Sequence, residues 1–306
     1  MKVLIFGGSG TFGTAMTKQL LDKCELIIHF DRDEKNQYIS KQNITDNKVV
    51  RVIGDIRDKE AVDNCIKTYK PNIVMLASAM KHIDKCEAYP DECRKTNIDG
   101  CVNVINSTID NEVEKFVFLS TDKSANPTTI YGCSKLFIEM YIQAVDSKKT
   151  TMLTTRYGNV LGSNGSVIDI WRRLKEKGEP LKITDPNMTR FFMPISGKYG
   201  ATDLVLYALE NGNNKDLWIY KNKSCSIKQL ADCISDNQIS IGLRCIEKND
   251  EALATITELN HSIIHNNIYY QINKNIKSDI EYKQPLTSDN AERFTYEELK
   301  ELVDEC

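Results

Sequence analysis

The sequence lacks the features that would place the protein in a membrane or on a nucleic acid. No apolar run reaches the roughly 20 residues that a membrane-spanning helix needs. The formal net charge is −3 and 27% of the residues are charged, so no general positive field is available to attract a nucleic acid. We therefore expect neither a membrane nor a nucleic-acid partner.

The cysteine and histidine patterns that are typical of metal sites are missing as well. The ten cysteines include no Cys-x-x-Cys pair, and the four histidines are dispersed along the chain. This distribution predicts no metal site. It also favours reduced thiols, and we therefore expect a cytoplasmic protein.

A glycine-rich turn follows the first predicted strand, Lys2–Phe6, and precedes a predicted helix, Thr14–Asp22. Three glycines spaced three apart allow a tight turn and let a pyrophosphate approach the backbone, while the amides at the helix start face the anion. This context predicts dinucleotide binding. The turn residues expected to contact the coenzyme are Gly7, Gly10, Thr11, Phe12 and Gly13.

The second predicted strand, Leu26–Phe30, ends in two residues that give opposite indications about the coenzyme. Asp31 is placed to accept hydrogen bonds from the ribose hydroxyls of NAD, whereas Arg32 can hold the additional phosphate of NADP. The residues alone leave this choice open. A third predicted strand precedes Asp55 and Ile56, where the carboxylate is placed to meet an adenine amino group, although capping a helix is an equally ordinary role.

The fourth predicted strand, Ile73–Leu76, carries a polar loop at its carboxyl end. Charged side chains there are placed to contact a coenzyme or a sugar, and the alternative is that they are solvated loop charges. A polar residue on the following apolar helix is expected to brace this loop. The residues concerned are Ala77, Ala79, Lys81, His82 and Asn97.

The polar stretch after the predicted strand Phe116–Leu119 contains the candidate catalytic residues. Tyr131 and Lys135 are four apart on a predicted helix, so both project from one face. An adjacent ammonium favours the phenolate, which predicts a lowered pKa for Tyr131 and a role as a base. Asp122 and Lys123 add a second acid–base pair upstream of them.

The second half of the chain offers candidate anion contacts. Asn159 and the glycine-rich turn after it provide amide donors without bulk, which suits a second diphosphate. Arg190 lies in a loop between apolar residues, where a phosphate partner and a structural ion pair are both possible roles.

Strands and helices alternate from residue 1 to about residue 160. This order predicts an α/β fold with a doubly wound, parallel Rossmann-type sheet and a smaller C-terminal substrate-binding lobe. We expect the coenzyme-binding domain to comprise residues 1–160 and about 190–235. The lobe is expected to comprise about 161–189 and 236–306.

Together these motifs resemble the extended short-chain dehydrogenase/reductase family over essentially the whole chain, and within it the inverting UDP-N-acetylglucosamine 4,6-dehydratases. In that family, retaining dehydratases usually carry Asp-Glu where this chain has Asp122 and Lys123, and simple epimerases carry neither. The segments that carry the resemblance are Arg32–Glu34, Met80–His82, Thr96–Ile98, Ser120–Pro127, Arg156–Val160 with Gly162–Ser163, and Met188–Phe191.

Two departures from the family pattern concern ligand binding. Asp31 stands where the family usually has serine, which bears on the choice of coenzyme. The segment Arg244–Glu251 departs from the family's Gly-Glu-Lys-x-His-Glu pattern, although Arg244 can still meet a uridine diphosphate oxygen.

The resemblance implies a tightly bound and recycled NADP, with NAD as the alternative, a UDP-sugar substrate, and a homodimer or higher homo-oligomer. It implies the catalytic residues Thr121, Asp122, Lys123, Tyr131 and Lys135, of which the last two also contact the coenzyme. The implied substrate contacts are Lys81, His82, Asn159, Ser166, Val167, Arg190 and Arg244. Two alternatives remain. One is a 4-epimerase or 4-reductase of the same fold, and the other is a non-catalytic coenzyme-sensing protein, which would not need the Tyr131–Lys135 pair.

Overall fold

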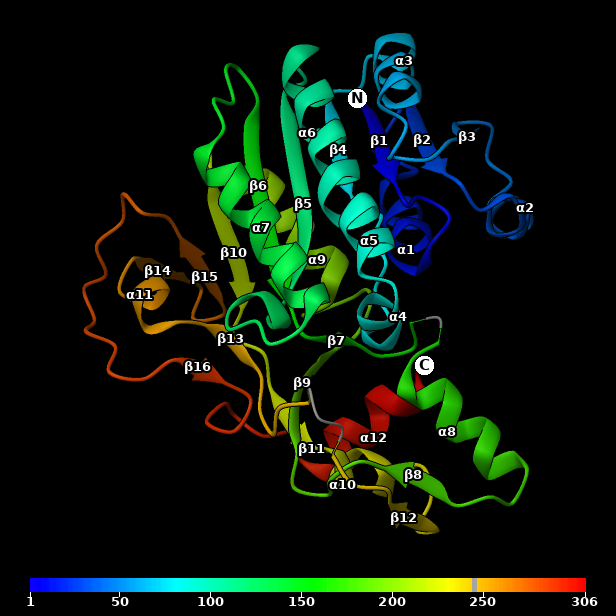
Figure 1. Cartoon of the computed structure of the whole chain (residues 1–306), viewed down its shortest axis with the longest axis vertical. Helices are drawn as coiled ribbons and strands as arrows, with labels where there is room; N and C mark the ends of the chain where they lie inside the picture. The colour runs from blue at the N-terminus through cyan, green and yellow to red at the C-terminus, as the bar shows by residue number, and fades with distance from the viewer. Residues whose placement is uncertain (164, 244–246) are drawn as a thin grey trace. The chain divides into compact units, whose positions relative to one another are not determined.

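Figure 1 shows a computed structural model of the chain, which describes residues 1–163, 165–243 and 247–306. The chain divides into two compact units. Unit 1 contains Met1–Arg156 and Leu204–Trp218, and unit 2 contains Tyr157–Asp203 and Ile219–Cys306. The segment that returns to unit 1 is therefore shorter than the 190–235 that the sequence predicted.

The sheet of unit 1 is built on five parallel strands in the order β5-β4-β1-β2-β3. They are β1 (Lys2–Phe6), β2 (Leu26–Asp31), β3 (Val49–Ile53), β4 (Ile73–Leu76) and β5 (Lys115–Thr121). The chain runs outward from β1 through β2 to β3, and then resumes on the other side of β1 with β4. This confirms the predicted doubly wound sheet, in which ligands bind beyond the carboxyl ends of the strands, where the order reverses.

The sheet order continues past β5 with further strands and ends in an antiparallel hairpin. These strands are β6 (Thr151–Tyr157), β10 (Asp216–Tyr220), β15 (Tyr269–Ile272) and β14 (Ser262–His265). The division between the two units falls within β10, after Trp218.

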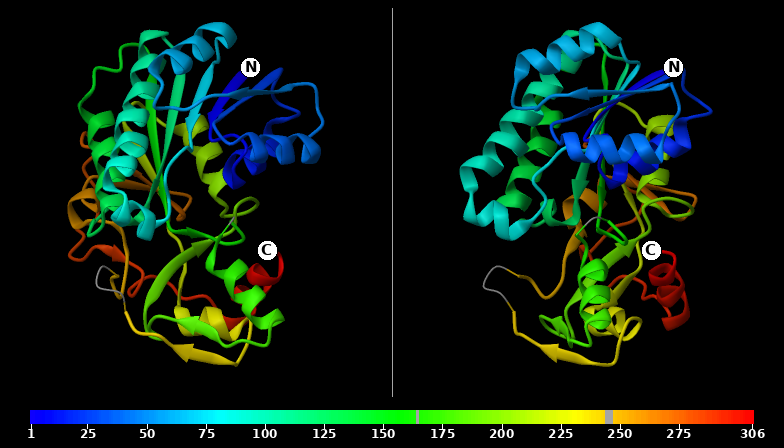
Figure 2. Two further views of the ribbon diagram at one scale, coloured as in Figure 1. Left: turned by 45° about the vertical axis from the view of Figure 1, so that its right-hand side comes forward. Right: turned by 90° about the vertical axis from the view of Figure 1, so that its right-hand side faces the viewer.

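Helices cover both faces of the sheet in unit 1 (Figure 2). On one face lie α3 (Lys59–Tyr69), α6 (Cys101–Asp110) and α7 (Ile130–Ala144), with α3 packed against α6. The other face carries α1 (Thr11–Leu20) and α9 (Ala201–Asn211). The remaining helices before β5 are α2 (Glu34–Asn43), α4 (Ile83–Ala88), α5 (Pro90–Arg94) and the π-helix η1 (Lys95–Gly100).

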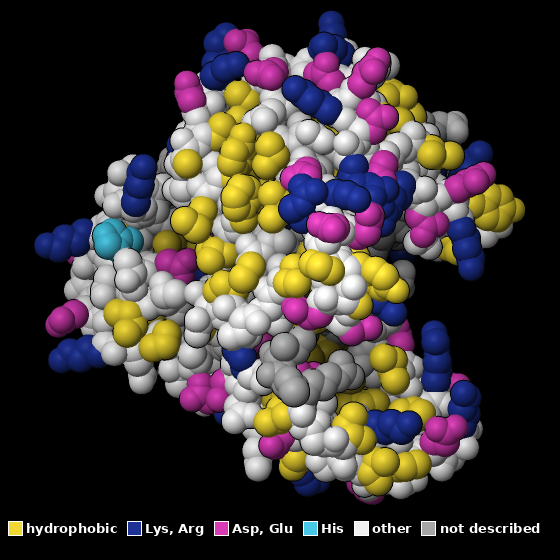
Figure 3. Space-filling view, in the orientation of Figure 1, with side chains coloured by type: hydrophobic (Ala, Val, Ile, Leu, Met, Phe, Trp, Pro, Cys, Tyr) yellow, Lys and Arg dark blue, Asp and Glu magenta, His cyan; other side chains and the backbone are white. Residues whose placement is uncertain are grey.

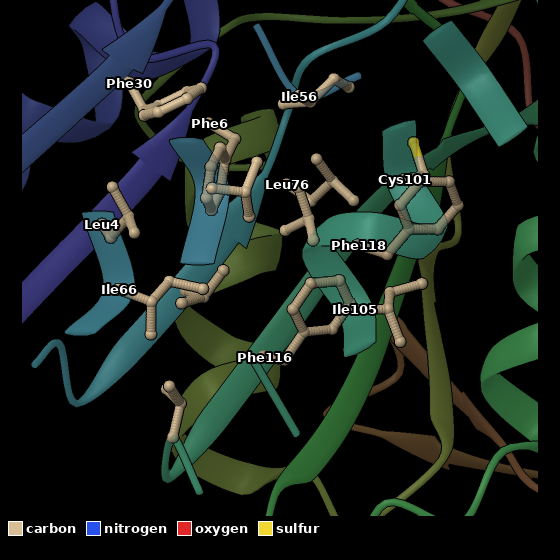
Figure 4. Close-up of a cluster of buried hydrophobic side chains, with 14 of the residues drawn as sticks. Leu4, Phe6, Phe30, Ile56, Ile66, Leu76, Cys101, Ile105, Phe116 and Phe118 are labelled. Atoms are coloured by element: carbon tan, nitrogen blue, oxygen red, sulfur yellow. The ribbon is translucent and has the colours of Figure 1, made fainter. Parts of the chain in front are cut away.

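The core of unit 1 lies between the strands and the helices α3, α6 and α7, and Figure 4 shows its side chains. Phe6 and Phe30 on neighbouring strands contact each other with ring centroids 5.0 Å apart. Phe116 and Phe118 extend the cluster onto β5, and Ile105 of α6 belongs to the same cluster. Strands of a parallel sheet are buried on both faces, which explains their continuous apolar sequences.

Unit 2 has its own core and is built from short strands. Its three-stranded sheet has the order β11 (Ser224–Ser226), β9 (Thr189–Met193), β7 (Asn159–Val160). Two pairs accompany it, β8 (Leu181–Ile183) with β12 (Gln238–Ser240) and β13 (Ala252–Ala254) with β16 (Leu286–Thr287). The helices are α8 (Val167–Glu176), α10 (Ile227–Asp232), α11 (Ile256–Leu259) and α12 (Tyr296–Asp304), and Trp171, Leu230 and Leu299 pack in the core.

Among the residues that the structure describes, no helix combines the length and the apolar character needed to cross a membrane.

Candidate active site

The glycine turn after β1 has the geometry that its sequence predicts. Gly7 has φ +86°, and a Cβ atom there would lie 2.9 Å from the amide nitrogen of Ser78, so only glycine fits. The Gly7 amide donates to the carbonyl of Phe30 at 2.9 Å. The turn is thus held between the carboxyl ends of β2 and β4, at the point where the strand order reverses.

The start of α1 is open to an anion. Gly10 is the N-cap and makes no side-chain capping bond, and Thr11–Thr14, the first turn, contains no acidic side chain. Gly13 allows α1 to approach the turn, because a Cβ atom there would lie 2.4 Å from the carbonyl oxygen of Gly8. The glycine N-cap and the helix dipole suit a pyrophosphate, so the residues of this turn fit a dinucleotide. The predicted contacts of Thr11 and Phe12 stay predictions.

A buried histidine supports this turn from below, and sequence reasoning did not single it out. His29 of β2 lies against Gly8, where an added Cβ would be 2.5 Å from the imidazole. Its Nε2 is 2.7 Å from Oγ1 of Thr17, and that hydroxyl donates to the Gly13 carbonyl at 2.7 Å. Because the threonine proton is already used, Nε2 must carry a proton and donate it. Burial lowers the pKa of His29 to about 4, with a smaller contribution from Arg51.

The acidic residues at the ends of β2 and β3 are held differently. Asp31 accepts a hydrogen bond from Ser9 at 2.5 Å, so its carboxylate is oriented at the edge of the glycine turn. Asp55 accepts from Arg57 at 2.7 and 2.9 Å and from Arg32 at 3.3 Å. Burial opposes its ionisation, but these arginine hydrogen bonds outweigh burial and lower the pKa of Asp55.

Asp55 is therefore an ion-pair partner rather than a helix cap, because Asp58 caps α3 by accepting from the Ala61 amide at 3.0 Å. The Ile56 side chain is buried in the core, and its carbonyl accepts from Asn103 at 3.1 Å. An adenine contact at Asp55 and Ile56 stays a prediction.

Asn97 braces the loop after β4, as the sequence predicted. Its side chain accepts from the Met80 amide at 2.8 Å and donates to the Met80 carbonyl at 3.0 Å. The wider turn of the π-helix η1 carries this buried asparagine. Ala77 and Ala79 are partly exposed, and Lys81 and His82 are exposed where α4 begins. Their contacts with a coenzyme or sugar stay predictions.

The turn after β5 places a buried carboxylate beside a lysine. Asp122 is fully buried in the short helix η2 (Asp122–Ser124). Its Oδ1 accepts from Lys123 Nζ at 2.9 Å and from Thr121 Oγ1 at 3.0 Å. Its Oδ2 has no hydrogen-bond partner among the described residues. A buried oxygen of this kind can carry or receive a proton.

Tyr131 and Lys135 lie in the first two turns of α7. Thr129 caps this helix by accepting from the Gly132 amide at 3.1 Å. Lys135 is buried, its Nζ donates to the Leu119 carbonyl at 2.9 Å, and burial lowers its pKa against opposing effects of Cys101 and Glu139.

The predicted lowering of the Tyr131 pKa is wrong for the protein by itself. Burial raises the pKa of Tyr131, the Asp122 charge adds to this, and a hydrogen bond with Thr121 opposes it. Lys135 directs its ammonium to a carbonyl instead of to the phenol. In this arrangement the phenol is protonated at neutral pH, and it needs further positive charge, such as a nicotinamide, to act as a base.

Gly132 is a further site residue that sequence reasoning missed. A Cβ atom on Gly132 would lie 2.4 Å from the carbonyl oxygen of Lys123, so glycine allows α7 to approach the turn that carries Asp122 and Lys123. The sequence feature that could have identified Gly132 is its position directly after Tyr131.

The predicted substrate contacts Asn159, Ser166 and Val167 lie in unit 2. Asn159 opens β7, and its side-chain amide donates to the Phe191 carbonyl at 3.1 Å. Ser166 is the N-cap of α8, and Val167 is its first residue. The Ser166 hydroxyl is buried and has no hydrogen-bond partner within the described part of the chain. It can therefore accept or donate to a ligand, and the diphosphate contact stays a prediction.

Arg190 has a structural role in unit 2. The side chain is buried in β9, and its guanidinium donates to the carbonyls of Thr189, Asn249 and Lys248 at 2.6 to 2.9 Å. It therefore ties the segment after residue 247 to β9, and a phosphate contact by the same group stays a prediction. Arg244 lies outside the described residues.

Within the described ranges, no group of three or more His, Cys, Asp or Glu side chains is arranged to hold a metal ion.

The fold and the site define the class of protein: an enzyme of the extended short-chain dehydrogenase/reductase type. A glycine turn fit for a dinucleotide and a Tyr131–Lys135 pair follow strands of one doubly wound sheet. Residues 3–273 match the profile of the family described as "Polysaccharide biosynthesis protein", and the chain belongs to this family.

Named relatives fall into two groups of activity. The chain is 35% identical to a UDP-glucose 4-epimerase of Rickettsia rickettsii, over 98% of this chain and 94% of the relative. It is 37% identical to an inverting UDP-N-acetylglucosamine 4,6-dehydratase of Campylobacter jejuni, over 90% of this chain and 83% of the relative.

Among solved structures, Pen from Bacillus thuringiensis superposes with a TM-score of 0.91 at 30% identity. The superposition includes 99% of this chain and 97% of the Pen chain.

Proposed function

We propose that the protein is a UDP-N-acetylglucosamine 4,6-dehydratase that inverts C5 and forms a UDP-2-acetamido-2,6-dideoxy-4-keto-hexulose. The observation that carries the proposal is the pair on η2. The buried carboxylate of Asp122 has an Oδ2 without a hydrogen-bond partner among the described residues, and Nζ of Lys123 is 2.9 Å from its other oxygen. Elimination of water needs an acid for the leaving hydroxyl and a base for the C5 hydrogen, and these two residues supply both.

The glycine turn, Asp31 and the Tyr131–Lys135 pair are the residues that would hold a nicotinamide coenzyme, which when bound takes hydride from C4 and returns it at C6. Tyr131 accepts the proton of the 4-hydroxyl, and Thr121 orients that hydroxyl. For this step the shared proton of the Lys123–Asp122 pair must lie on the carboxylate. The neutral amine of Lys123 then removes the C5 hydrogen, which the adjacent ketone has made acidic, and the carboxylic acid of Asp122 protonates the departing 6-hydroxyl. C5 afterwards receives a proton on its opposite face, which inverts it. Lys135 would hold the nicotinamide ribose.

We propose NADP as the coenzyme because of Arg32. Its side chain is 51% exposed, and among the described residues its ion-pair partner is Asp55 at 3.3 Å. Asp55 is bound more closely by Arg57 at 2.7 Å, so Arg32 can turn to a phosphate at little cost. The oriented carboxylate of Asp31 favours NAD instead, and a variant described in the Discussion separates the two.

The experiment incubates the purified protein with UDP-N-acetylglucosamine or UDP-glucose in deuterated water and follows the products by NMR. The expected product is a 4-keto-6-deoxy sugar with inverted C5 and solvent deuterium at C5. A product that keeps its 6-hydroxyl and differs only at C4 would reject dehydration.

The second candidate function is 4-epimerisation, favoured by the 35% identity to the Rickettsia rickettsii epimerase over nearly the whole chain. An epimerase needs the Tyr131–Lys135 pair but no acid–base pair for elimination. The same NMR experiment decides between the two, because epimerisation incorporates no solvent deuterium at C5.

We further propose that the protein forms at least a homodimer through α6 and α7. Figure 3 shows apolar side chains gathered on the face of unit 1 that these helices form. On α7, Met140 is 62% and Phe137 is 46% exposed, although Ile138 and Ile142 of the same helix already fill the core. A helix that is apolar on several sides is usually buried on several sides. Light scattering in dilute solution should give at least twice the monomer mass, and Met140→Lys should reduce it; a monomeric wild type would contradict the proposal.

A further inference from the structure

One buried carboxylate lies behind the catalytic turn and has no part in the chemistry described above. Glu139 is on α7, one turn after Lys135, and is almost completely buried. Arg156 at the end of β6 is fully buried and pairs with it through two hydrogen bonds, one of them from Nε at 3.1 Å. The guanidinium thus holds both the position and the orientation of the carboxylate.

The same carboxylate accepts hydrogen bonds from both ends of the catalytic turn. Ser120, the residue before Thr121, donates to Glu139 Oε1. Ser124, the residue after Lys123, lies 2.7 Å from the same oxygen and 2.6 Å from the Thr121 carbonyl. Ser120 and Ser124 are both buried, so they have no access to water as an alternative partner.

We propose that Glu139 is the positioning residue of the active site, which fixes the Thr121–Lys123 segment to the helix that carries Tyr131 and Lys135. The inference rests on the proposed function for the roles of these residues. Glu139 connects β5, η2, α7 and β6 through a single side chain. The residues between its two serine contacts are Thr121, Asp122 and Lys123.

The physical reason is the cost of leaving a buried charge unsatisfied. Removing one serine donor leaves the carboxylate with fewer partners in a site that water does not reach. Once a donor is lost, fewer contacts hold the turn to α7, and the turn can shift relative to the helix. Reacting groups displaced by about 1 Å can lose about 100-fold in rate.

The test compares Ser120→Ala, Ser124→Ala and Glu139→Gln with the control Ile142→Val. Ile142 is fully buried one turn further along α7 and packs in the core, so its truncation lowers stability without touching the turn. Turnover is measured on whichever UDP-sugar reaction the wild-type enzyme performs, together with KM, coenzyme Kd and Tm.

We expect Ser124→Ala to lower kcat about tenfold and Glu139→Gln about 100-fold, with KM and coenzyme Kd changed less than about twofold. Ser124→Ala combined with Glu139→Gln should be no slower than Glu139→Gln alone, because both act through one contact. Ile142→Val should lose about as much Tm as these variants but keep the kcat of the wild type.

Wild-type kcat in Ser120→Ala and Ser124→Ala would overturn the proposal, and these two variants decide if Glu139→Gln does not fold. The proposal would also be overturned if the control Ile142→Val, at the same Tm as the other variants, showed the same fall in kcat. If wild type neither dehydrates nor epimerises, the proposed function fails by itself. The inference is then judged by hydrogen exchange, which Ser124→Ala must accelerate at residues 121–125 and Ile142→Val must not.

Discussion

Two turns at the same edge of the sheet are stabilised in opposite ways. The coenzyme turn after β1 is held by backbone contacts, with Gly7 at φ +86° and its amide bonded to Phe30. The catalytic turn after β5 is held by side chains, through Ser120, Ser124 and Glu139. The first turn must leave its amides free for an anion, whereas the second must present ionisable groups in one geometry.

The difference predicts how each turn responds to substitution. In the catalytic turn single side chains carry the chemistry, so their loss should affect rate far more than ligand binding. In the coenzyme turn the backbone binds the ligand, so side-chain changes should act through stability and coenzyme choice.

The largest effect is expected for Tyr131→Phe, which removes the ionisable oxygen and keeps the ring. Turnover should fall by about 10²- to 10⁴-fold, the usual contribution of a positioned acid or base. Coenzyme affinity, measured by fluorescence titration, should stay nearly unchanged. Turnover close to that of wild type would remove Tyr131 from the mechanism.

Lys123→Ala should slow dehydration by about 100-fold or more because the base for C5 is lost. Lys123→Glu, which imitates the Asp-Glu pair of retaining dehydratases, should abolish dehydration or weaken inversion. Products are compared by NMR in deuterated water, and any product should still carry deuterium at C5. Full inversion at the wild-type rate in Lys123→Ala would place the base elsewhere, and His82 would be the next residue to test.

The same contrast explains what the sequence could predict. The strands β1 to β4 were expected almost to the residue, because buried parallel strands are continuous apolar runs between polar turns. The coenzyme turn was also predictable, since its requirement is for glycine itself. The role of Glu139 was not predictable. Nothing in the sequence shows that Ser120, Glu139 and Arg156 come into contact in the folded chain.

Unit 2 was much harder to predict, for a physical reason. Its strands β7, β8, β11 and β12 are two or three residues long, too short for an alternating pattern to appear. Arg190 shows the consequence: the sequence left a phosphate partner and a structural ion pair both open. The structure surrounds its guanidinium with three carbonyls that only the folded chain brings together.

A smaller effect, on stability rather than rate, is expected for His29 beneath the coenzyme turn. Its folded pKa is about 4, below its ordinary value of 6.5, because burial disfavours the charged ring. As the pH falls from about 6.5 toward 4, the unfolded state binds the proton first, so the folded state loses stability. Wild type should lose about 3 kcal/mol more than His29→Gln between pH 7 and pH 4. Urea unfolding at both pH values measures this; equal losses in the two proteins would contradict it.

The smallest effect concerns Arg32, where the coenzyme turn depends on a side chain. Arg32→Ala should weaken NADP by about 1.5–3 kcal/mol, the range for a charge-assisted contact to phosphate, and should leave NAD almost unchanged. Lys35→Ala is the matched control, because Lys35 is an exposed cation three residues further along the same segment. Calorimetric titration of both coenzymes against both variants separates a specific contact from a general loss of positive charge. If Arg32→Ala weakens NAD and NADP equally, then Asp31, held by Ser9 at 2.5 Å, sets the preference, and the coenzyme is NAD.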